Sequence, residues 1–465
     1  MKKIYAVFGA ALLMMGCKPN VIVTQTPTAG RADFSNYLAI GNSLTSGYTD
    51  NSLTVSGQLN SYPERLFEQF QLIPGTKGGS KSYFIQPLLH SDNGYPSAKY
   101  VLGYTYNACT GDSSLGPIPY PNFVADPIDA NRYVWPNANY NLGQVNNLGV
   151  PGIRVADLPV AGYAVNMNPY AARFFNKMGA ANTPFDEYLY RINSLHPSFF
   201  TMWMGANDVL GYATAGGVGD GTGLAAPAAL NIYNTTDITP TTVFTTCYDS
   251  LVRLAIKTGA YGALINIPDV TSLPFFNVIP SNSLIITRQS EADSLNALWA
   301  HYPVTKAFAL GANQMMVYDH NNHIRQSIPG ELILLNLPQS STSCAGYGAT
   351  QAIPSQYVLT TDELQNIHTA TTAFNQFIYQ EALRYNLAYV DMNKYLSTVY
   401  SGVEYNGVSY NAQFVTGGAF SLDGIHLTQR GYALVANQII ATIDSSYKST
   451  IPLIDVNKYN GVLFP

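Results

Sequence analysis

The chain has 465 residues, of which 47% are hydrophobic and only 11% are charged, with a formal net charge of −5. This length suffices for a large core in one extended domain or in two ordinary ones, and the absence of a basic stretch argues against nucleic acid as a partner. The 34 tyrosines gather with Asn, Pro and Gly in long connecting segments. Such segments are found in clefts for carbohydrate or lipid and equally on the surface of exported proteins.

The first residues have the pattern of a targeting segment. Two lysines precede an apolar run at residues 4–15, which ends at Gly16 and Cys17 and is too short to cross a bilayer as a mature helix. A small residue directly before Cys resembles the lipobox of bacterial lipoproteins, in which the Cys is diacylated and becomes the new N-terminus. We therefore expect a signal peptide at residues 1–16 and a polar tether at residues 17–32. The alternative is an ordinary secretory signal with an incidental Cys.

This resemblance implies membrane attachment through a lipid on Cys17 and a location in the bacterial cell envelope, on the periplasmic or the surface face of the outer membrane. The rest of the chain has no segment apolar enough for a second membrane crossing.

Short apolar runs then alternate with amphipathic stretches, which is typical of an α/β protein. Strands are predicted at residues 33–40, 144–148, 197–204, 262–267 and 387–390. Helices are predicted at residues 62–70, 246–258, 362–385 and 428–443. This alternation favours a parallel sheet of about five strands covered on both faces, with ligand sites beyond the carboxyl ends of the strands.

The predicted elements span one domain at residues 33–447, followed by a C-terminal tail at residues 448–465. Three long connections, at about residues 91–140, 211–242 and 275–361, are predicted insertions. Structureless loops longer than ~15 residues are uncommon unless they are functional. We therefore expect these insertions to build a lid, a cleft wall or a small subdomain.

Cysteines add little to this picture. Apart from Cys17, the chain has Cys109, Cys247 and Cys344, at wide spacings and without a zinc or redox motif. One disulfide with one free thiol fits this number, and the sequence leaves all three pairings open. We predict no cofactor and no metal.

Three residues have the chemistry of a nucleophilic site. Ser43 lies directly after the first predicted strand, whereas Asp423 and His426 lie three residues apart just before the last predicted helix. A serine hydroxyl is a weak nucleophile until an imidazole removes its proton, and a carboxylate holds that imidazole in the required tautomer.

Two further segments offer hydrogen-bond donors at strand ends. Residues 147–152 follow the second predicted strand and end in Gly152, and residues 205–208 follow the third and contain Asn207. Acyl transfer passes through a tetrahedral oxyanion that needs donors placed in advance, such as a glycine N–H or an Asn amide. Taken singly, these are weak signals: a Gly-rich loop after a strand is usually just a turn, and residues 205–208 alone could be a helix cap.

Taken together and in this order, the four segments resemble the GDSL esterase/lipase family, also called the SGNH hydrolases. The resemblance implies that Ser43 is the nucleophile, His426 the general base and Asp423 the group that orients it. It also implies an oxyanion hole made of the Ser43 and Gly152 N–H groups and the Asn207 side chain. The fold that it implies is a three-layer α/β/α, flavodoxin-like arrangement. Residues 266–270, with the Leu-Pro pair at 273–274, are similar to the region after the fourth strand in esterase and lipase members.

The sequence departs from the family at two places. Asn42 stands where the family has Asp, but an Asn of similar shape can still bond to neighbouring backbone, so we expect an active enzyme. The step from Ser43 to Gly152 is 109 residues long and leaves room for an insertion.

Other segments are weaker candidates. Gly111, Asp112 and Ser113 spell part of the family's serine motif, but no strand is predicted before them. The chain has no GxSxG, which argues against an α/β-hydrolase nucleophile elbow. Residues 319–323 offer two imidazoles and a carboxylate, for which a solvated polar loop is the alternative to a metal site. The histidines without a nearby catalytic partner in sequence are expected to be ordinary surface or core residues: His90, His196, His301 and His368.

The sequence therefore predicts a serine hydrolase that cleaves carboxylic esters through an acyl-enzyme on Ser43, acting on a small-molecule, glycan or lipid ester. Two alternatives stay open. One is a carbohydrate O-acetylesterase of the same fold. The other is a non-catalytic glycan- or lipid-binding envelope lipoprotein.

Overall fold

The computed structural model describes residues 26–78, 84–130, 145–175, 179–227 and 232–464. The expected signal peptide, Cys17 and most of the expected tether lie outside these residues. Residues 26–32, the described end of that tether, pack on the domain: Ala29 and Ala32 are buried, and the Arg31 N–H donates to the carbonyl oxygen of Tyr447. Within the described part of the chain, no helix combines the length and the apolar character that a membrane crossing requires.

The fold is built on five parallel strands, as the sequence predicts. In chain order they are β1 (Tyr37–Gly41), β4 (Asn147–Gly149), β5 (Phe199–Trp203), β6 (Tyr261–Ile265) and β14 (Ala388–Val390). Their order in the sheet is β14-β6-β5-β1-β4. The chain thus lays β4 on one side of β1 and then returns to add the remaining strands on the other side, so the direction of winding reverses between β1 and β5.

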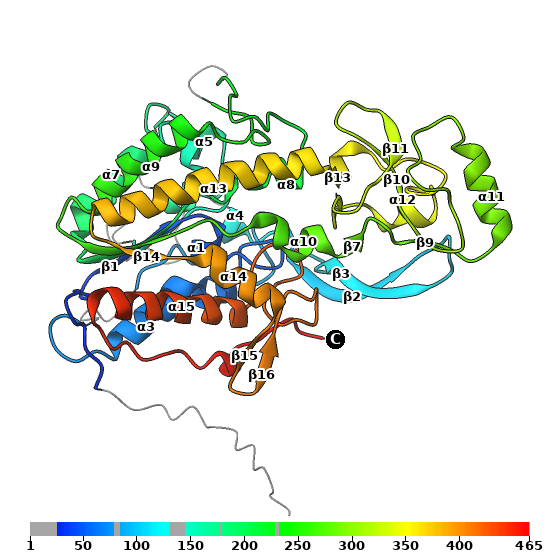
Figure 1. Cartoon of the computed structure of the whole chain (residues 1–465). Helices are drawn as coiled ribbons and strands as arrows, with labels where there is room; N and C mark the ends of the chain where they lie inside the picture. The colour runs from blue at the N-terminus through cyan, green and yellow to red at the C-terminus, as the bar shows by residue number, and fades with distance from the viewer. Residues whose placement is uncertain (1–25, 79–83, 131–144, 176–178, 228–231, 465) are drawn as a thin grey trace, which may run out of the picture.

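Helices cover both faces of this sheet (Figure 1). One face carries α7 (Pro184–Leu195), α8 (Asn207–Thr214), α9 (Thr241–Ala255) and α13 (Thr361–Arg384). The other carries α3 (Tyr62–Gln71), α14 (Met392–Ser401) and α15 (Gln429–Tyr447). The four predicted helices are confirmed as α3, α9, α13 and α15, whereas α7, α8 and α14 were not predicted.

The first strand is shorter than the sequence predicts, because residues 33–36 are held in a bend. The Asp33 carboxylate accepts a hydrogen bond from the Ser35 N–H at 2.9 Å, and the Asn36 N–H donates to the Ser198 hydroxyl at 2.9 Å. These side-chain bonds replace ladder bonds, so regular pairing begins at Tyr37.

Short elements complete the main domain. They are α1 (Ser43–Ser46), α2 (Val55–Leu59), α4 (Pro127–Ala130), α5 (Tyr163–Asn166), α6 (Ala171–Phe174), β15 (Val403–Tyr405) and β16 (Val408–Tyr410). The C-terminal tail packs on the domain rather than leaving it, since Ile451, Ile454 and Val456 are buried.

The first insertion contains an antiparallel hairpin of β2 (Tyr100–Tyr106) and β3 (Ser113–Pro119). The expectation that no strand precedes Gly111, Asp112 and Ser113 is therefore wrong, since these residues form the end of the hairpin turn and the start of β3. The aromatic and β-branched residues at 100–106 were the signal for this strand.

The third insertion forms a small subdomain with its own hydrophobic cluster around Trp299, Phe308 and Met316. It lies at the right end of the molecule in Figure 1, beyond the start of α13. Its elements are α10 (Pro274–Asn277), β7 (Ile279–Pro280), β8 (Leu284–Ile286), α11 (Gln289–Leu298), β9 (Gly311–Asn313), β10 (Met316–Tyr318), β11 (Ile324–Gln326), β12 (Leu332–Ile333), α12 (Gln339–Ser343) and β13 (Val358–Leu359).

A disulfide joins these two insertions. Cys109, in the turn between β2 and β3, is bonded to Cys344 at the end of α12, with the Cα atoms 5.4 Å apart. The Asn107 amide donates to the Ser343 hydroxyl beside it at 2.8 Å. Cys247 is the free thiol and is buried in α9. The structure thus selects one of the three pairings that the sequence left open.

Candidate active site

Ser43 lies at the carboxyl end of β1, on the first residue of α1. The Asn42 side chain accepts a hydrogen bond from the Leu44 N–H at 3.1 Å and so caps this turn, which confirms its expected bond to neighbouring backbone. Gly41 is required here, because an added Cβ would lie 2.8 Å from the Trp203 carbonyl oxygen of the adjacent strand. The Ser43 N–H, at the free start of the helix, makes no hydrogen bond within the described residues.

The structure brings His426 to Ser43 across 383 positions of the chain. The distance from His426 Nε2 to Ser43 Oγ is 2.9 Å, and the distance from His426 Nδ1 to Asp423 Oδ2 is 2.8 Å. With Nδ1–H donating to the carboxylate, Nε2 is left to accept the serine proton. Ser43 is 7% exposed and the His426 side chain 13%, so the pair is reachable yet largely shielded from water.

Asp423 is held as a buried anion. One of its oxygens accepts from the Ser421 hydroxyl at 3.0 Å and from the N–H groups of Ile425 and His426, both at 2.8 Å. The other accepts from His426 Nδ1 and from the Asn51 N–H at 2.9 Å. Burial alone raises the pKa of this carboxyl, but the charge and hydrogen bonds of His426, with the other backbone donors, hold the pKa well below its usual range.

The turn at Asp50 and Asn51, which supports this loop, was not predicted from the sequence. Both residues have positive φ angles, 51° and 62°, which Asp and Asn tolerate better than most residues. The Asp50 carboxylate accepts from the Leu422 N–H at 3.0 Å, and the Asp50 N–H donates to the Ser421 hydroxyl at 3.1 Å. Burial raises the pKa of Asp50 to about 6, with a further rise from Asp423 and an opposing effect of the Leu422 bond.

Tyr48 was also missed by sequence reasoning. Its ring packs on the His426 imidazole with the ring centres 4.6 Å apart. Its backbone is fixed at both ends, because its N–H donates to the Ser43 carbonyl at 3.0 Å and its carbonyl accepts from the Tyr432 hydroxyl at 2.6 Å. The ring therefore limits how far the imidazole can swing away from the serine.

The expected oxyanion donors lie on two adjoining segments. Gly152 follows β4 with a φ of 80°, and its N–H makes no hydrogen bond to any described residue. Asn207 begins α8, and its amide donates to the Ile153 carbonyl, next to Gly152, at 3.0 Å. The buried carboxylate of Asp208 fastens this loop to α8 by accepting from the Val155 N–H at 2.9 Å. Unpaired N–H groups on Ser43 and Gly152 are suited to stabilise an oxyanion.

An apolar slot adjoins Ser43. Its polar lining consists of Asn42, Ser43, Asn207 and His426. The rest of its lining is apolar: Leu44, Ala206, Leu210, Pro268, Val270, Leu273, Leu396, Phe420, Ile425 and Leu427. The residues after β6 that were expected to resemble the esterase and lipase region thus form part of this wall. The slot is small, with a cavity volume of about 30 Å³.

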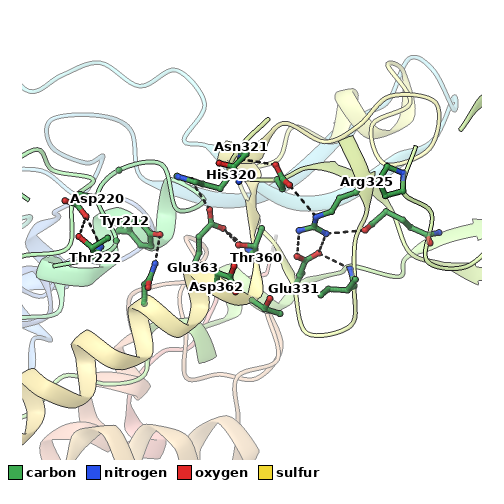
Figure 2. A pocket seen from close by; sticks show the side chains of 18 of the residues that line it. Tyr212, Asp220, Thr222, His320, Asn321, Arg325, Glu331, Thr360, Asp362 and Glu363 are labelled. Atoms are coloured by element: carbon green, nitrogen blue, oxygen red, sulfur yellow. Dashed lines mark hydrogen bonds and ion pairs between the residues drawn. The ribbon is translucent and has the colours of Figure 1, made fainter. Parts of the chain in front are cut away.

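A larger polar cleft lies where the main domain meets the subdomain, and its lining includes Asp319, His320 and Asn321 but none of the expected catalytic or oxyanion residues. Figure 2 shows Tyr212, Asp220 and Thr222 on one side, His320, Asn321 and Arg325 from the subdomain on the other, and Thr360, Asp362 and Glu363 at the start of α13. His320 Nδ1 lies 3.5 Å from the Glu363 carboxylate, and His323 Nδ1 lies 3.5 Å from Asp319. Among the described residues, no group of three or more His, Cys, Asp or Glu side chains could hold a metal ion.

The remaining candidates stay apart from this site. Ser113 is exposed on β3, and His90 pairs with Asp126 at 2.9 Å on the surface. His196 ends α7 with a φ of 49°, while His301 and His368 are exposed. A search of protein-family models finds no match to the chain, and a search of curated proteins finds none either.

Proposed function

We propose that the chain is a serine hydrolase of carboxylic esters. The observation that carries this proposal is the chain of contacts from Ser43 Oγ through the His426 ring to the Asp423 carboxylate, at 2.9 and 2.8 Å. This arrangement gives the hydroxyl a base that is already in the required tautomer, next to unpaired N–H groups.

The reaction proceeds in two halves. Ser43 Oγ attacks the ester carbonyl while His426 Nε2 takes its proton, and the negative oxygen is stabilised by the Ser43 and Gly152 N–H groups and the Asn207 amide. Collapse of this intermediate transfers the proton to the leaving alcohol and leaves an acyl group on Ser43. Water activated by His426 then attacks the acyl-enzyme, and the acid departs. Asp423 stays ionised and stabilises the imidazolium in both halves.

Membership of the GDSL or SGNH hydrolases, with a three-layer flavodoxin-like fold, is part of the proposal. The strand order supports it. When the five strands are numbered along the chain, their order across the sheet is 2-1-3-4-5, which is the flavodoxin-like order. In such sheets, ligands bind where the winding direction reverses. Ser43 follows β1 and Asn207 follows β5, the two strands on either side of that point.

We propose further that the protein is exported and anchored in the bacterial envelope through a lipid on Cys17. Besides the lipobox-like sequence, the disulfide between Cys109 and Cys344 supports this location, since disulfides persist in oxidising compartments outside the cytosol. Mass spectrometry of the N-terminal peptide, compared with Cys17→Ser, tests it. An unmodified peptide that keeps residues 1–16 would contradict it.

Labelling with a fluorophosphonate tests the chemistry directly, because this reagent reacts with activated serines. We expect covalent labelling at Ser43, identified by peptide mapping, together with hydrolysis of p-nitrophenyl butyrate. Both should disappear in Ser43→Ala and persist in Ser113→Ala, a matched change at the exposed serine of the similar motif. A folded wild-type protein that is neither labelled nor active would mean that the chain is a binding module.

A further inference from the structure

We infer that a polar groove along α13 binds a neutral glycan chain, at a site separate from Ser43. None of the proposed reacting residues lines this groove. The inference therefore does not depend on ester hydrolysis. It goes beyond the proposed function because it names a second binding site and the chemical class of its ligand, an uncharged polysaccharide.

The groove follows one exposed stripe of α13, which runs from the subdomain along the main domain (Figure 1). Three hollows lie along this helix: the polar cleft of Figure 2 at its start, a second that shares Thr361 with the cleft, and a third that shares His368 with the second. The exposed residues that line them recur every three or four positions and so lie on one face of the helix. They are Thr361, Gln365, His368, Thr372, Gln376 and Tyr379.

The stripe is polar without being charged. None of its members has a carboxylate, an ammonium or a guanidinium group, although charged residues are usual on the solvent face of a helix. Its amides and hydroxyls can donate and accept hydrogen bonds, as sugar hydroxyls do. At the helical rise per residue, the stripe from Thr361 to Tyr379 is about 27 Å long. This length suits a chain of several sugar units rather than a single sugar.

A fixed aromatic ring lies at one end of the stripe. Tyr379 is 42% exposed, and its ring packs edge-on against that of Tyr389 with the ring centres 5.1 Å apart. Tyr389 is held in turn, because its hydroxyl accepts from the Asn266 amide at 2.7 Å. Both rings line the third hollow. A tyrosine held in this way offers an apolar face to a sugar ring and a hydroxyl to its polar edge.

Thr371, also in the lining of the third hollow, has an unsatisfied hydroxyl. The residue is only 7% exposed, and its hydroxyl makes no hydrogen bond to any described residue. A buried polar group without a partner costs free energy, and such groups are rare in folded proteins. A ligand hydroxyl at this point would supply the partner that the protein does not.

The wall opposite α13 is fixed before any ligand arrives. The Asn375 amide accepts from the Ile267 N–H at 2.8 Å and donates to the Ile267 carbonyl at 2.7 Å. The Asn393 amide donates to the same carbonyl at 3.0 Å. Both amides therefore clamp the segment after β6 between α13 and α14. A groove that is already ordered loses little conformational entropy when it binds a ligand.

Other classes of ligand fit this lining less well. Among the described residues that line the three hollows, the only Lys or Arg is Arg325, and its guanidinium bonds to the Glu331 carboxylate at 2.9 and 2.5 Å. No cation is thus left for the phosphates of a nucleic acid. Most of the lining is polar, whereas a lipid or the centre of a protein interface needs an apolar surface. Carboxylates in the cleft, such as that of Asp362, can accept from sugar hydroxyls, and a cationic polymer is the competing ligand that the test has to separate.

The groove and the active site share the segment after β6. Pro268 and Val270 line the slot beside Ser43, whereas Asn266 and Asp269 line the groove. A glycan bound in the groove is therefore held close to Ser43. On the proposed function, an ester carried by the same polymer would be presented to the nucleophile at a raised effective concentration.

The test is affinity electrophoresis in native gels that contain hydroxyethylcellulose, arabinoxylan or galactomannan, three neutral polysaccharides. Retardation relative to a gel without polysaccharide, measured as a function of polysaccharide concentration, gives Kd. We expect retardation in at least one of these gels, equal for the wild type and for Ser43→Ala. An excess of pentalysine should not relieve it, because the ligand is uncharged.

Two changes in the stripe have matched controls. Tyr379→Ala should raise Kd at least about tenfold through the loss of aromatic contact area, whereas Tyr400→Ala, at 41% exposure on α14 and outside the groove, should leave Kd unchanged. Gln376→Ala should raise Kd about fivefold through the loss of a hydrogen bond, whereas Gln380→Ala, one turn further along the same exposed helix, should not. Gln376→Ala covers the case in which Tyr379→Ala fails to fold, because alanine is favourable at an exposed helical position.

The outcomes separate this inference from the proposed function. A wild-type protein that runs freely in all three gels would overturn the groove, and fluorophosphonate labelling of Ser43 would still leave ester hydrolysis standing. Retardation that is lost in Ser43→Ala, or that is unchanged in Gln376→Ala, would place the glycan elsewhere and also overturn it. Relief by pentalysine would identify a site for cations instead. Retardation with no labelling of Ser43 would support the groove and overturn the hydrolase.

Discussion

Asp423→Asn is the most informative single change, because both oxygens of this carboxylate accept hydrogen bonds and neither faces an acceptor. Three donors meet one of its oxygens, and His426 Nδ1 and the Asn51 N–H meet the other. An Asn amide must place its NH₂ group at one of these positions. The position with fewer donors is that of Oδ2, where the NH₂ group would donate to His426 Nδ1 and oppose the Asn51 N–H. His426 would then carry its proton on Nε2 and could no longer accept the proton of Ser43.

The corresponding change in a serine protease triad lowers kcat about 10⁴-fold, and we expect a similar loss here, which corresponds to about 5.4 kcal/mol. The assay is kcat and KM for p-nitrophenyl butyrate, with circular dichroism to establish that the variant is folded. KM should change little, since the variant leaves the slot intact. Ser421→Ala, which removes one of the three donors to the other oxygen, is the matched control and should lose less than tenfold in kcat. A folded Asp423→Asn protein within tenfold of the wild-type rate would refute the assigned role.

Four further predictions follow from the same geometry. Asn207→Ala should lower kcat by about 10²–10³-fold without unfolding the protein, because it removes one oxyanion donor; an unchanged rate with a short acyl ester would exclude Asn207 from the oxyanion hole. Gly152→Ala should lower the free energy of unfolding by about 1–2 kcal/mol, measured in urea, since its φ of 80° is unfavourable for a residue with a Cβ even though that Cβ would make only an ordinary contact of 3.7 Å with the Asn168 amide. The pKa of Asp50 is raised to about 6 in the folded state, so the native protein binds more protons than the unfolded chain between about pH 4 and pH 6, and stability falls as the pH rises through that range. Asp50→Asn should therefore be more stable than the wild type at pH 8, by about 3 kcal/mol in urea unfolding, and equally stable at pH 4; a variant no more stable than the wild type at pH 8 would speak against a buried charge. Replacing Cys109 and Cys344 by Ser should lower stability by about 5 kcal/mol if the bond acts by closing a loop of 235 positions, and thermal melting with and without reductant checks this value.

The sequence was sufficient for the central sheet, because each strand is a short apolar run bounded by turn residues. The helix α7 was missed even though Thr183, Pro184 and Asp186 carry a helix-start pattern, with Thr183 and Asp186 forming a capping box. The hairpin of β2 and β3 was hidden in a stretch rich in Gly and Pro, where composition suggested only a loop. The predicted start of the first strand was wrong because side chains, such as that of Asp33, make the hydrogen bonds that a strand ladder would otherwise make.

For the candidate site, sequence reasoning reached the residues that stand at the ends of strands. Ser43, Gly152 and Asn207 each follow a strand of one parallel sheet, so their proximity follows from topology. The contact of Asn51 with Asp423 spans 372 positions and depends on how two loops meet, which no local pattern encodes. The apolar lining of the slot has the same character, since its residues come from separate elements and look like ordinary core in the sequence.

The 383 positions between Ser43 and His426 also govern when activity can begin. A ribosome incorporates Ser43 early and His426 much later. In a chain that crosses a membrane from its N-terminus, the two residues reach the far side in the same order. Throughout this interval the serine has no base, and a serine hydroxyl alone is a weak nucleophile. On the proposed function, the cell that makes the protein is therefore spared its hydrolytic activity until nearly the whole domain has been made and has closed around the site.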